Sequence, residues 1–177
     1  MPRLTLQEHR GQSSRKRCSA NGVDDEGIKL FLDKLQLKSH KKNDIIMQEG
    51  DEGHSILFLL SGEITITKAL TLATNKNNDN NDNREKEFIR CKAENNIIIG
   101  EVSLFSEDSK RTATVKALNN CDIAYLERKD FFEICNKNTD IGYKVINNLT
   151  QIITQRLIDT NHQVLKLTTA LSLIVDN

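Results

Sequence analysis

A glycine, an acid and an arginine lie close together in the segment GEVSLFSEDSKRTATVKA, residues 100–117. Gly100 precedes a predicted short helical turn over 102–105, whose free N–H groups favour an anion. The guanidinium of Arg111 is planar and permanently charged and suits phosphate oxygens. An ionised Glu101 only accepts hydrogen bonds, so it suits a sugar hydroxyl. One acid, one base and one group of amides indicate a small phosphosugar ligand with a single negative charge.

The elements that must position these residues are predicted mainly from periodicity. Residues 1–22 are polar and aperiodic, which predicts a disordered tail. A short amphipathic helix follows, with four apolar residues on one face: Ile28, Phe31, Leu32 and Leu35. From Asn43 to Leu126, short strands alternate with Gly and Asn turns, a pattern typical of an antiparallel barrel or jelly roll. The expected strands are 44–47, 56–60, 63–68, 88–91, 97–99, 112–118 and 122–126.

Two connections in the strand region have their own signals. Residues 75–87, NKNNDNNDNREKE, contain no apolar residue to bury and predict a mobile loop. Asn119 and Asn120 are predicted to join the last two strands in a tight hairpin, because asparagine tolerates a positive φ.

The C-terminal region, from Asp130 to Val175, is predicted to be helical with hardly a helix breaker in it. A heptad seam follows this helix: Ile146, Thr150, Ile153, Leu157, Thr160, Val164, Leu167, Leu171 and Ile174. The seam predicts a partner helix, most simply that of a parallel homodimer. The alternative is a helix packed along one groove of its own chain.

Composition excludes several classes of protein. The chain has 177 residues, a formal net charge of +0 and 28% charged residues, so no basic field attracts nucleic acid. No apolar run is long enough to span a bilayer, and no secretory signal is evident. The four cysteines have no CxxC spacing, which argues against a zinc or iron–sulfur site and favours reduced, mostly buried thiols of a cytoplasmic protein. No nucleophile–base set, P-loop or kinase motif is present, so no enzymatic activity is expected.

The segment 100–117 resembles the phosphate-binding cassette of cyclic nucleotide-binding domains. The family pattern is Gly-Glu, any residue, a small and an aliphatic residue, a spacer, then Arg, Ser or Thr, and Ala. A second family signature, IMQEGDEGHSILFLLSG at 46–62, precedes it. The resemblance covers roughly residues 28–175. Over these residues the chain is similar to the ligand-binding half of catabolite activator proteins.

The resemblance implies a role for each matching residue. Glu101 would hold the ribose 2′-hydroxyl and Arg111 the cyclic phosphate. Thr112 would add a hydroxyl near the phosphate and the purine, which permits cGMP without excluding cAMP. Amides near four residues would complete the cassette: Gly100, Val102, Ser103 and Ala113. Two polar residues of the C-terminal helix are the candidates for covering the base: Thr160 and Asn161.

The sequence therefore predicts an α+β fold, an antiparallel jelly-roll barrel with a short N-terminal and a long C-terminal helix. We expect a tail over 1–22, a cyclic nucleotide-binding barrel over 23–138 and a lid and dimerisation helix over 139–177. The expected function is a stand-alone sensor of cAMP or cGMP, without metal or other cofactor, that signals to an unidentified effector protein. Because the sequence ends at Asn177, no DNA-binding helix-turn-helix is expected within it.

Three alternatives remain open. The chain is the ligand-binding half of a transcription regulator if a helix-turn-helix follows it. It is a kinase-regulatory protein if the basic stretch before Ser19 is a kinase substrate. It is a ligand-free scaffold if Glu101 and Arg111 form only a salt bridge.

Overall fold

The computed structural model describes residues 22–69, 85–95 and 97–175. The described chain forms two compact units, one comprising Ile28–Ile134 and the other comprising the rest. The tail predicted over 1–22 lies outside the described residues except for Gly22, and so does most of the loop predicted over 75–87.

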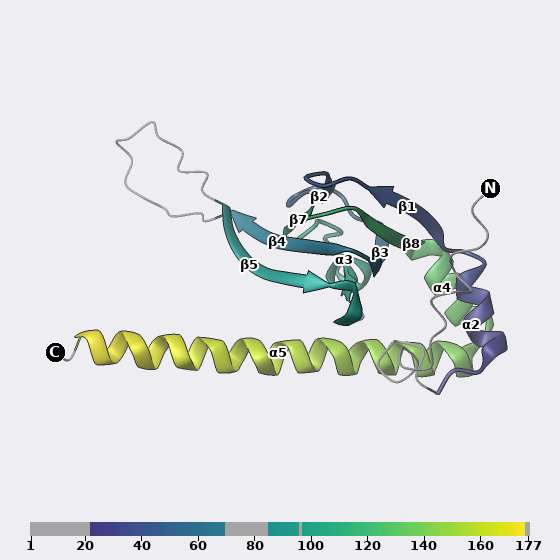
Figure 1. The fold of residues 1–177 in the computed structure, drawn as a ribbon. Helices are drawn as coiled ribbons and strands as arrows, with labels where there is room; N and C mark the ends of the chain where they lie inside the picture. Colours follow the sequence, from purple (N-terminus) through teal and green to yellow (C-terminus); the bar gives the residue numbers. More distant parts are fainter. Residues whose placement is uncertain (1–21, 70–84, 96, 176–177) are drawn as a thin grey trace. The chain divides into compact units, whose positions relative to one another are not determined.

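The larger unit contains two four-stranded antiparallel sheets (Figure 1). The first sheet has the order β1-β8-β3-β6, with β1 (Gln36–His40), β8 (Cys121–Glu127), β3 (Ser55–Ser61) and β6 (Ile98–Ile99). The second has the order β2-β7-β4-β5, with β2 (Ile45–Met47), β7 (Thr114–Ala117), β4 (Glu63–Ala69) and β5 (Glu85–Lys92). Apart from β4 and β5, strands that are neighbours in a sheet come from distant parts of the sequence, as in a jelly roll. The predicted fold class is confirmed.

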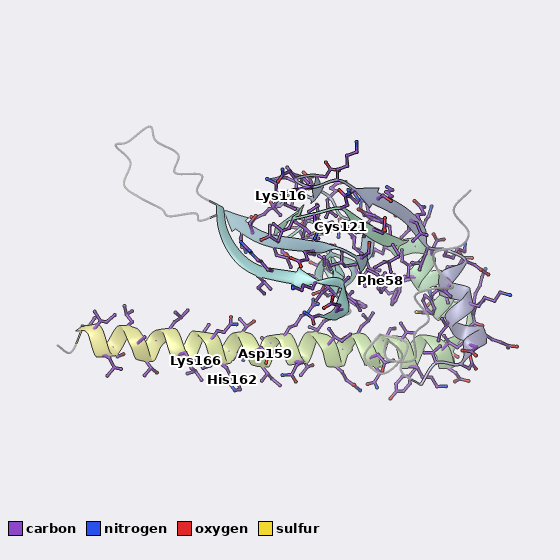
Figure 2. All side chains as sticks on the ribbon, in the orientation of Figure 1. Phe58, Lys116, Cys121, Asp159, His162 and Lys166 are labelled. Atoms are coloured by element: carbon purple, nitrogen blue, oxygen red, sulfur yellow. The ribbon has the colours of Figure 1, made fainter. Side chains whose placement is uncertain are left out.

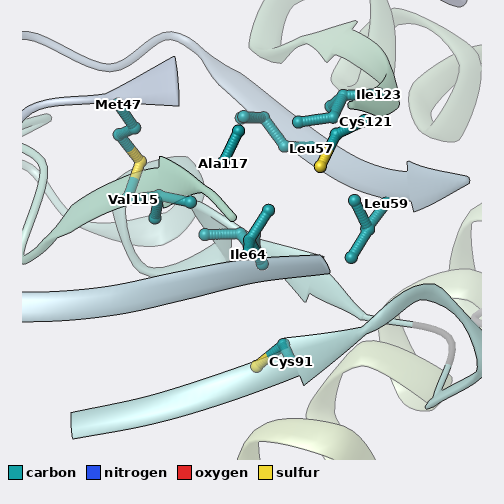
Figure 3. Close-up of a cluster of buried hydrophobic side chains, with 10 residues drawn as sticks. Met47, Leu57, Leu59, Ile64, Cys91, Val115, Ala117, Cys121 and Ile123 are labelled. Atoms are coloured by element: carbon teal, nitrogen blue, oxygen red, sulfur yellow. The ribbon is translucent and has the colours of Figure 1, made fainter. Parts of the chain in front are cut away.

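Apolar side chains from both sheets meet between them and form the core (Figure 3). Ile64, Val115 and Ile123 are fully buried there. Cys91 and Cys121 contribute buried free thiols to the same cluster. The buried members of this cluster are aliphatic or sulfur-containing, whereas the aromatic Phe131 is buried elsewhere, against Phe105 and Phe132.

Within the described residues, five helical elements accompany the sheets. They are α2 (Asp25–Leu32), the 3-10 turn η2 (Ala93–Asn95), α3 (Glu101–Phe105), α4 (Arg128–Lys137) and α5 (Thr139–Val175). No helix within the described ranges is long and apolar enough to cross a membrane.

Two strand predictions were wrong. Sequence analysis missed β1, because its burial pattern is mostly exposed and Leu37 is its one large apolar residue. Antiparallel pairing of its backbone with β8, over Gln36–His40, keeps this segment in the strand conformation. The predicted hairpin at Asn119 and Asn120 is absent, because β7 and β8 belong to different sheets and Asn43 is the one described non-glycine residue with a positive φ.

Several boundaries also differ from the prediction, and three of them concern the helices and the predicted loop. The N-terminal helix ends at Leu32, so Leu35 lies beyond it. β5 begins at Glu85 and therefore includes the end of the segment predicted as a loop. The C-terminal helix is interrupted at Asn138, between α4 and α5. Asn-Thr-Asp at this point is a helix-start signal that periodicity alone overlooked.

Candidate functional site

The cassette begins at a glycine whose backbone no other residue adopts readily. Gly100 lies just before α3 and has a φ of 82°. A Cβ atom here would overlap the Arg111 guanidinium and lie 2.9 Å from the Ser55 carbonyl oxygen. Glycine is therefore required both for the turn and for the close approach of Arg111. The short helix predicted over 102–105 is confirmed as α3.

The Arg111 side chain is buried, with a relative exposure of 8%, and is fixed by serine and backbone oxygens. Its Nη1 donates to the Ser55 carbonyl oxygen at 2.8 Å and to Ser103 Oγ at 3.0 Å. Its Nη2 donates to Ser55 Oγ at 3.1 Å. Ser103 Oγ in turn donates to the Gly100 carbonyl oxygen at 2.9 Å. The guanidinium is therefore held in one orientation by neutral acceptors.

Burial of this cation has an electrostatic cost. Loss of hydration lowers the pKa of Arg111 below its ordinary value, and the nearby Tyr125 and Glu127 side chains oppose that shift. Arginine stays protonated in proteins, so the site retains a full positive charge. A buried cation with neutral partners favours an anion that can approach it.

The two sequence signatures are hydrogen-bonded to each other around Arg111. The Arg111 N–H donates to the Asp51 carbonyl oxygen at 2.8 Å, and the Gly50 N–H donates to the Arg111 carbonyl oxygen at 2.9 Å. The Gly53 N–H donates to the Ser109 carbonyl oxygen at 2.7 Å. A Cβ atom on Gly53 would overlap the Arg111 side chain itself. The loop before β3 is thus built to receive the arginine.

Sequence reasoning missed Ser55 and Gly53 as parts of the site, although both lie inside the second signature. Ser103 was expected to act through its backbone, whereas the structure uses its hydroxyl to hold Arg111. Serine after a glycine-rich loop is a weak signal by itself. Only the fold shows that Ser55 and Ser103 face the same guanidinium.

The remaining cassette residues differ in exposure. Glu101 is buried at 8% relative exposure, while Val102 is 48% exposed. Thr112 is exposed and Ala113 is half-buried. An exposed hydroxyl beside a buried arginine is available to a ligand that reaches the arginine.

The two candidates for covering the base lie on α5, in the other compact unit. Thr160 and Asn161 are both exposed, and the Thr160 hydroxyl donates to the Arg156 carbonyl oxygen at 2.8 Å. Figure 2 labels Asp159 and His162, which flank them on the helix. The structure therefore brings together the cassette residues of the larger unit and leaves the role of this pair a prediction.

Tyr125 provides a second polar feature near the arginine. Its hydroxyl lies 2.9 Å from His40 Nε2, and Lys38 Nζ lies 4.9 Å from its ring centroid. Burial raises the pKa of Tyr125, and the positive charge of Arg111 opposes that rise. The phenol is therefore neutral near pH 7 and acts as a hydrogen-bonding group.

Comparison with protein families and curated proteins gives consistent matches. The family model described as cyclic nucleotide-binding domain matches residues 37–138. The cAMP-activated global transcriptional regulator CRP of Pasteurella multocida is 24% identical over 140 residues, which cover 79% of this chain and 59% of that protein. The CRP of Haemophilus influenzae is 24% identical over 143 residues, covering 81% of this chain and 57% of that protein. The chain thus spans little more than half the length of these relatives.

Solved structures share the fold. The catabolite activator protein of Thermus thermophilus has a TM-score of 0.68 at 19% identity, covering 85% of this chain and 62% of that chain. The regulatory domain of Toxoplasma gondii PKA with cAMP has a TM-score of 0.55 at 22% identity, covering 68% of this chain and 41% of that chain. These likenesses agree with the jelly-roll topology of the larger unit.

Proposed function

The chain belongs to the cyclic nucleotide-binding domain family, and on this premise we propose that it is a sensor that binds cAMP or cGMP in its cassette. Arg111 pairs with the cyclic phosphate, and Glu101 accepts a hydrogen bond from the ribose 2′-hydroxyl. Amides of Gly100, Val102, Ser103 and Ala113 complete the contacts. Thr112 adds a hydroxyl near the purine, which permits cGMP without excluding cAMP.

The observation that carries this proposal is the environment of Arg111. Its three hydrogen bonds to described residues all go to neutral oxygens of Ser55 and Ser103. A guanidinium kept for structure alone is expected to pair with a carboxylate, because a buried charge is otherwise costly. Glu127 acts on Arg111 electrostatically but makes none of these hydrogen bonds. A ligand phosphate would supply a directly bonded negative charge, which supports binding over the ligand-free scaffold.

We propose that the signal leaves the barrel through the two C-terminal helices. Ligand draws in the cassette, α4 moves, and α5 closes over the base through Thr160 and Asn161. The barrel over 23–138 then acts as the receiver and the helix over 139–177 as the lid and dimerisation element, which presents a surface to an effector protein. Ligand can shift this equilibrium only by its differential affinity for the two states.

The deciding experiment is isothermal titration of the purified chain with cAMP and with cGMP. We expect saturable binding of at least one of them, and we expect Arg111→Ala to weaken it by about 2–5 kcal/mol, the typical cost of truncating one partner of a buried charge pair. Lys110→Ala is the matched control, because it removes an exposed cation next to Arg111 in the sequence. Undiminished affinity in Arg111→Ala would refute the cassette assignment. Absence of binding by either nucleotide to the wild-type chain would favour the scaffold.

A second candidate follows from the names of the curated relatives, which are transcriptional regulators. The chain would then be the ligand-binding part of a DNA-binding protein. Cloning the full reading frame and measuring its binding to duplex DNA with and without cAMP tests this candidate. A kinase-regulatory role rests on Ser19, which lies outside the described residues; phosphorylation of Ser19 in vitro tests it.

A further inference from the structure

A separate cavity of about 390 Å³ lies outside the cassette, in the larger unit. It is lined by His54, Glu127, Arg128, Lys129 and Phe132. The volume is in the range of small-molecule sites. Two chain segments supply its walls, the loop before β3 and the junction of β8 with α4.

Hydrogen bonds and ring contacts give this cavity a fixed frame. The Arg128 N–H donates to the His54 carbonyl oxygen at 2.6 Å, which joins the two segments. Arg128 Nη1 lies 3.4 Å from the Ser106 carbonyl oxygen, at the end of α3. Phe132 packs edge-on against Phe105, with ring centroids 6.1 Å apart. The aromatic wall and one cation are therefore positioned before any ligand enters.

The charges that line the cavity are predominantly positive. Arg128 and Lys129 are two permanent cations, whereas Glu127 is the one lining carboxylate. Glu127 also interacts electrostatically with Arg111 of the cassette, so its negative charge acts on both sites. The Arg128 guanidinium carbon lies 5.8 Å from the centroid of Phe132, a geometry that places positive charge beside a flat apolar surface.

We propose that this cavity is a second ligand site, distinct from the cassette, that takes a small organic phosphate carrying a flat ring. The ring packs against Phe132, and the phosphate lies between Arg128 and Lys129, where charge-assisted hydrogen bonds are strong. Glu127 accepts a hydrogen bond from a hydroxyl or amino group of the ligand. Since the cavity uses neither Arg111 nor Glu101, the proposal does not depend on cyclic nucleotide binding.

The test titrates phenyl phosphate into the full chain, followed by calorimetry and by shifts of backbone amide resonances in NMR. We expect binding to persist in Arg111→Ala, where the cassette guanidinium is removed, with shifts at residues 127–132. Combined Arg128→Gln and Lys129→Gln should weaken binding at least about tenfold, because two charge-assisted hydrogen bonds are lost. Lys110→Gln is the control for Lys129→Gln, because it removes the same charge from another exposed lysine.

Four results would overturn the proposal. Loss of phenyl phosphate binding in Arg111→Ala would place the probe in the cassette. Lys129 is exposed, so this position tolerates substitution. If Lys129→Gln alone bound phenyl phosphate with unchanged affinity, Lys129 would not contact the phosphate. If inorganic phosphate bound as tightly as phenyl phosphate, the ring would contribute nothing to binding. The same conclusion would follow if Phe132→Leu bound phenyl phosphate as tightly as the wild-type chain. Each of these results tests the second site even if neither cAMP nor cGMP binds to the cassette.

Discussion

Arg111 combines the properties of a receptor for a single anion. The side chain is buried and charged, and hydrogen bonds to the oxygens of Ser55 and Ser103 of the same chain orient it. Such preorganisation reduces the entropy lost on binding. The glycines at 53 and 100 provide the space that the guanidinium occupies. At the scale of residues, we therefore expect ligand affinity to depend on the side chains that orient Arg111 as well as on those that contact the ligand.

The first residue-scale prediction concerns Gly53. Its φ lies outside the left-handed region, so Gly53→Ala acts through volume alone, and the new methyl group displaces Arg111. We expect cyclic nucleotide affinity to fall by about 1–3 kcal/mol, the usual cost of overpacking, as measured by calorimetry. Gly22→Ala is the control, because Gly22 has a φ of 77° and open space around it and lies outside both sequence signatures. This control should lower the melting temperature and spare affinity; equal affinities in the two variants would contradict the steric role of Gly53.

The second residue-scale prediction concerns the choice of base. Thr112 is exposed beside the buried arginine, so its hydroxyl is available to a guanine amino group. Thr112→Ala should weaken cGMP binding by about 0.5–1.5 kcal/mol, the value of one hydrogen bond, and leave cAMP binding nearly unchanged. Competition of both nucleotides for one fluorescent analogue measures the ratio directly. A ratio that does not change would exclude Thr112 from base selection.

At the scale of elements, the junction of α4 with α5 is sterically constrained at Gly142. A Cβ atom on Gly142 would lie 2.7 Å from the Cys135 carbonyl oxygen and 2.8 Å from its Cα. The Gly142 N–H also donates to the Asn138 carbonyl oxygen at 2.8 Å, in the first turn of α5. Glycine therefore allows the two helices to approach each other closely just after the break at Asn138.

Gly142→Ala tests this contact. The steric cost should destabilise the fold by about 1–3 kcal/mol, even though alanine gains roughly 1 kcal/mol of helix propensity over glycine. Urea unfolding followed by circular dichroism measures the difference. His162→Ala, at an exposed position of the same helix, is the control and should be neutral or slightly stabilising. A more stable Gly142→Ala variant would show that the helices are free to separate.

At the scale of the whole molecule, α5 changes character along its length. Val145 and Leu149 near its start are buried, at 6% and 2% relative exposure. Leu167 and Ile174 of the heptad seam are 71% and 73% exposed. Apolar side chains at heptad spacing favour a second helix, because burial removes their surface from water. We therefore retain the proposal that the seam pairs with a second copy in parallel.

Leu167→Lys tests the dimer. Each copy loses about 1.5–3 kcal/mol of stabilisation from apolar burial, so the dissociation constant of the dimer should rise at least about hundredfold. Sedimentation equilibrium should then give the mass of one 20.1 kDa chain where the wild type gives twice that value. His162→Lys places the same charge on the face opposite the seam and should leave the dimer intact. A wild-type chain that is monomeric at high concentration would leave the single-chain groove as the explanation of the seam.

The sequence by itself determined what depends on local order. Periodicity located the barrel region and the helical C-terminal region, and the cassette located Gly100, α3 and Arg111 along the chain. Only the tertiary structure decided which distant residues meet, because contacts between strands far apart in sequence leave no local pattern. It showed that Ser55 and Ser103 share one guanidinium, and that Asn119 and Asn120 connect two sheets. It also revealed β1, an exposed edge strand held by backbone pairing with β8, which hydrophobic patterns cannot detect.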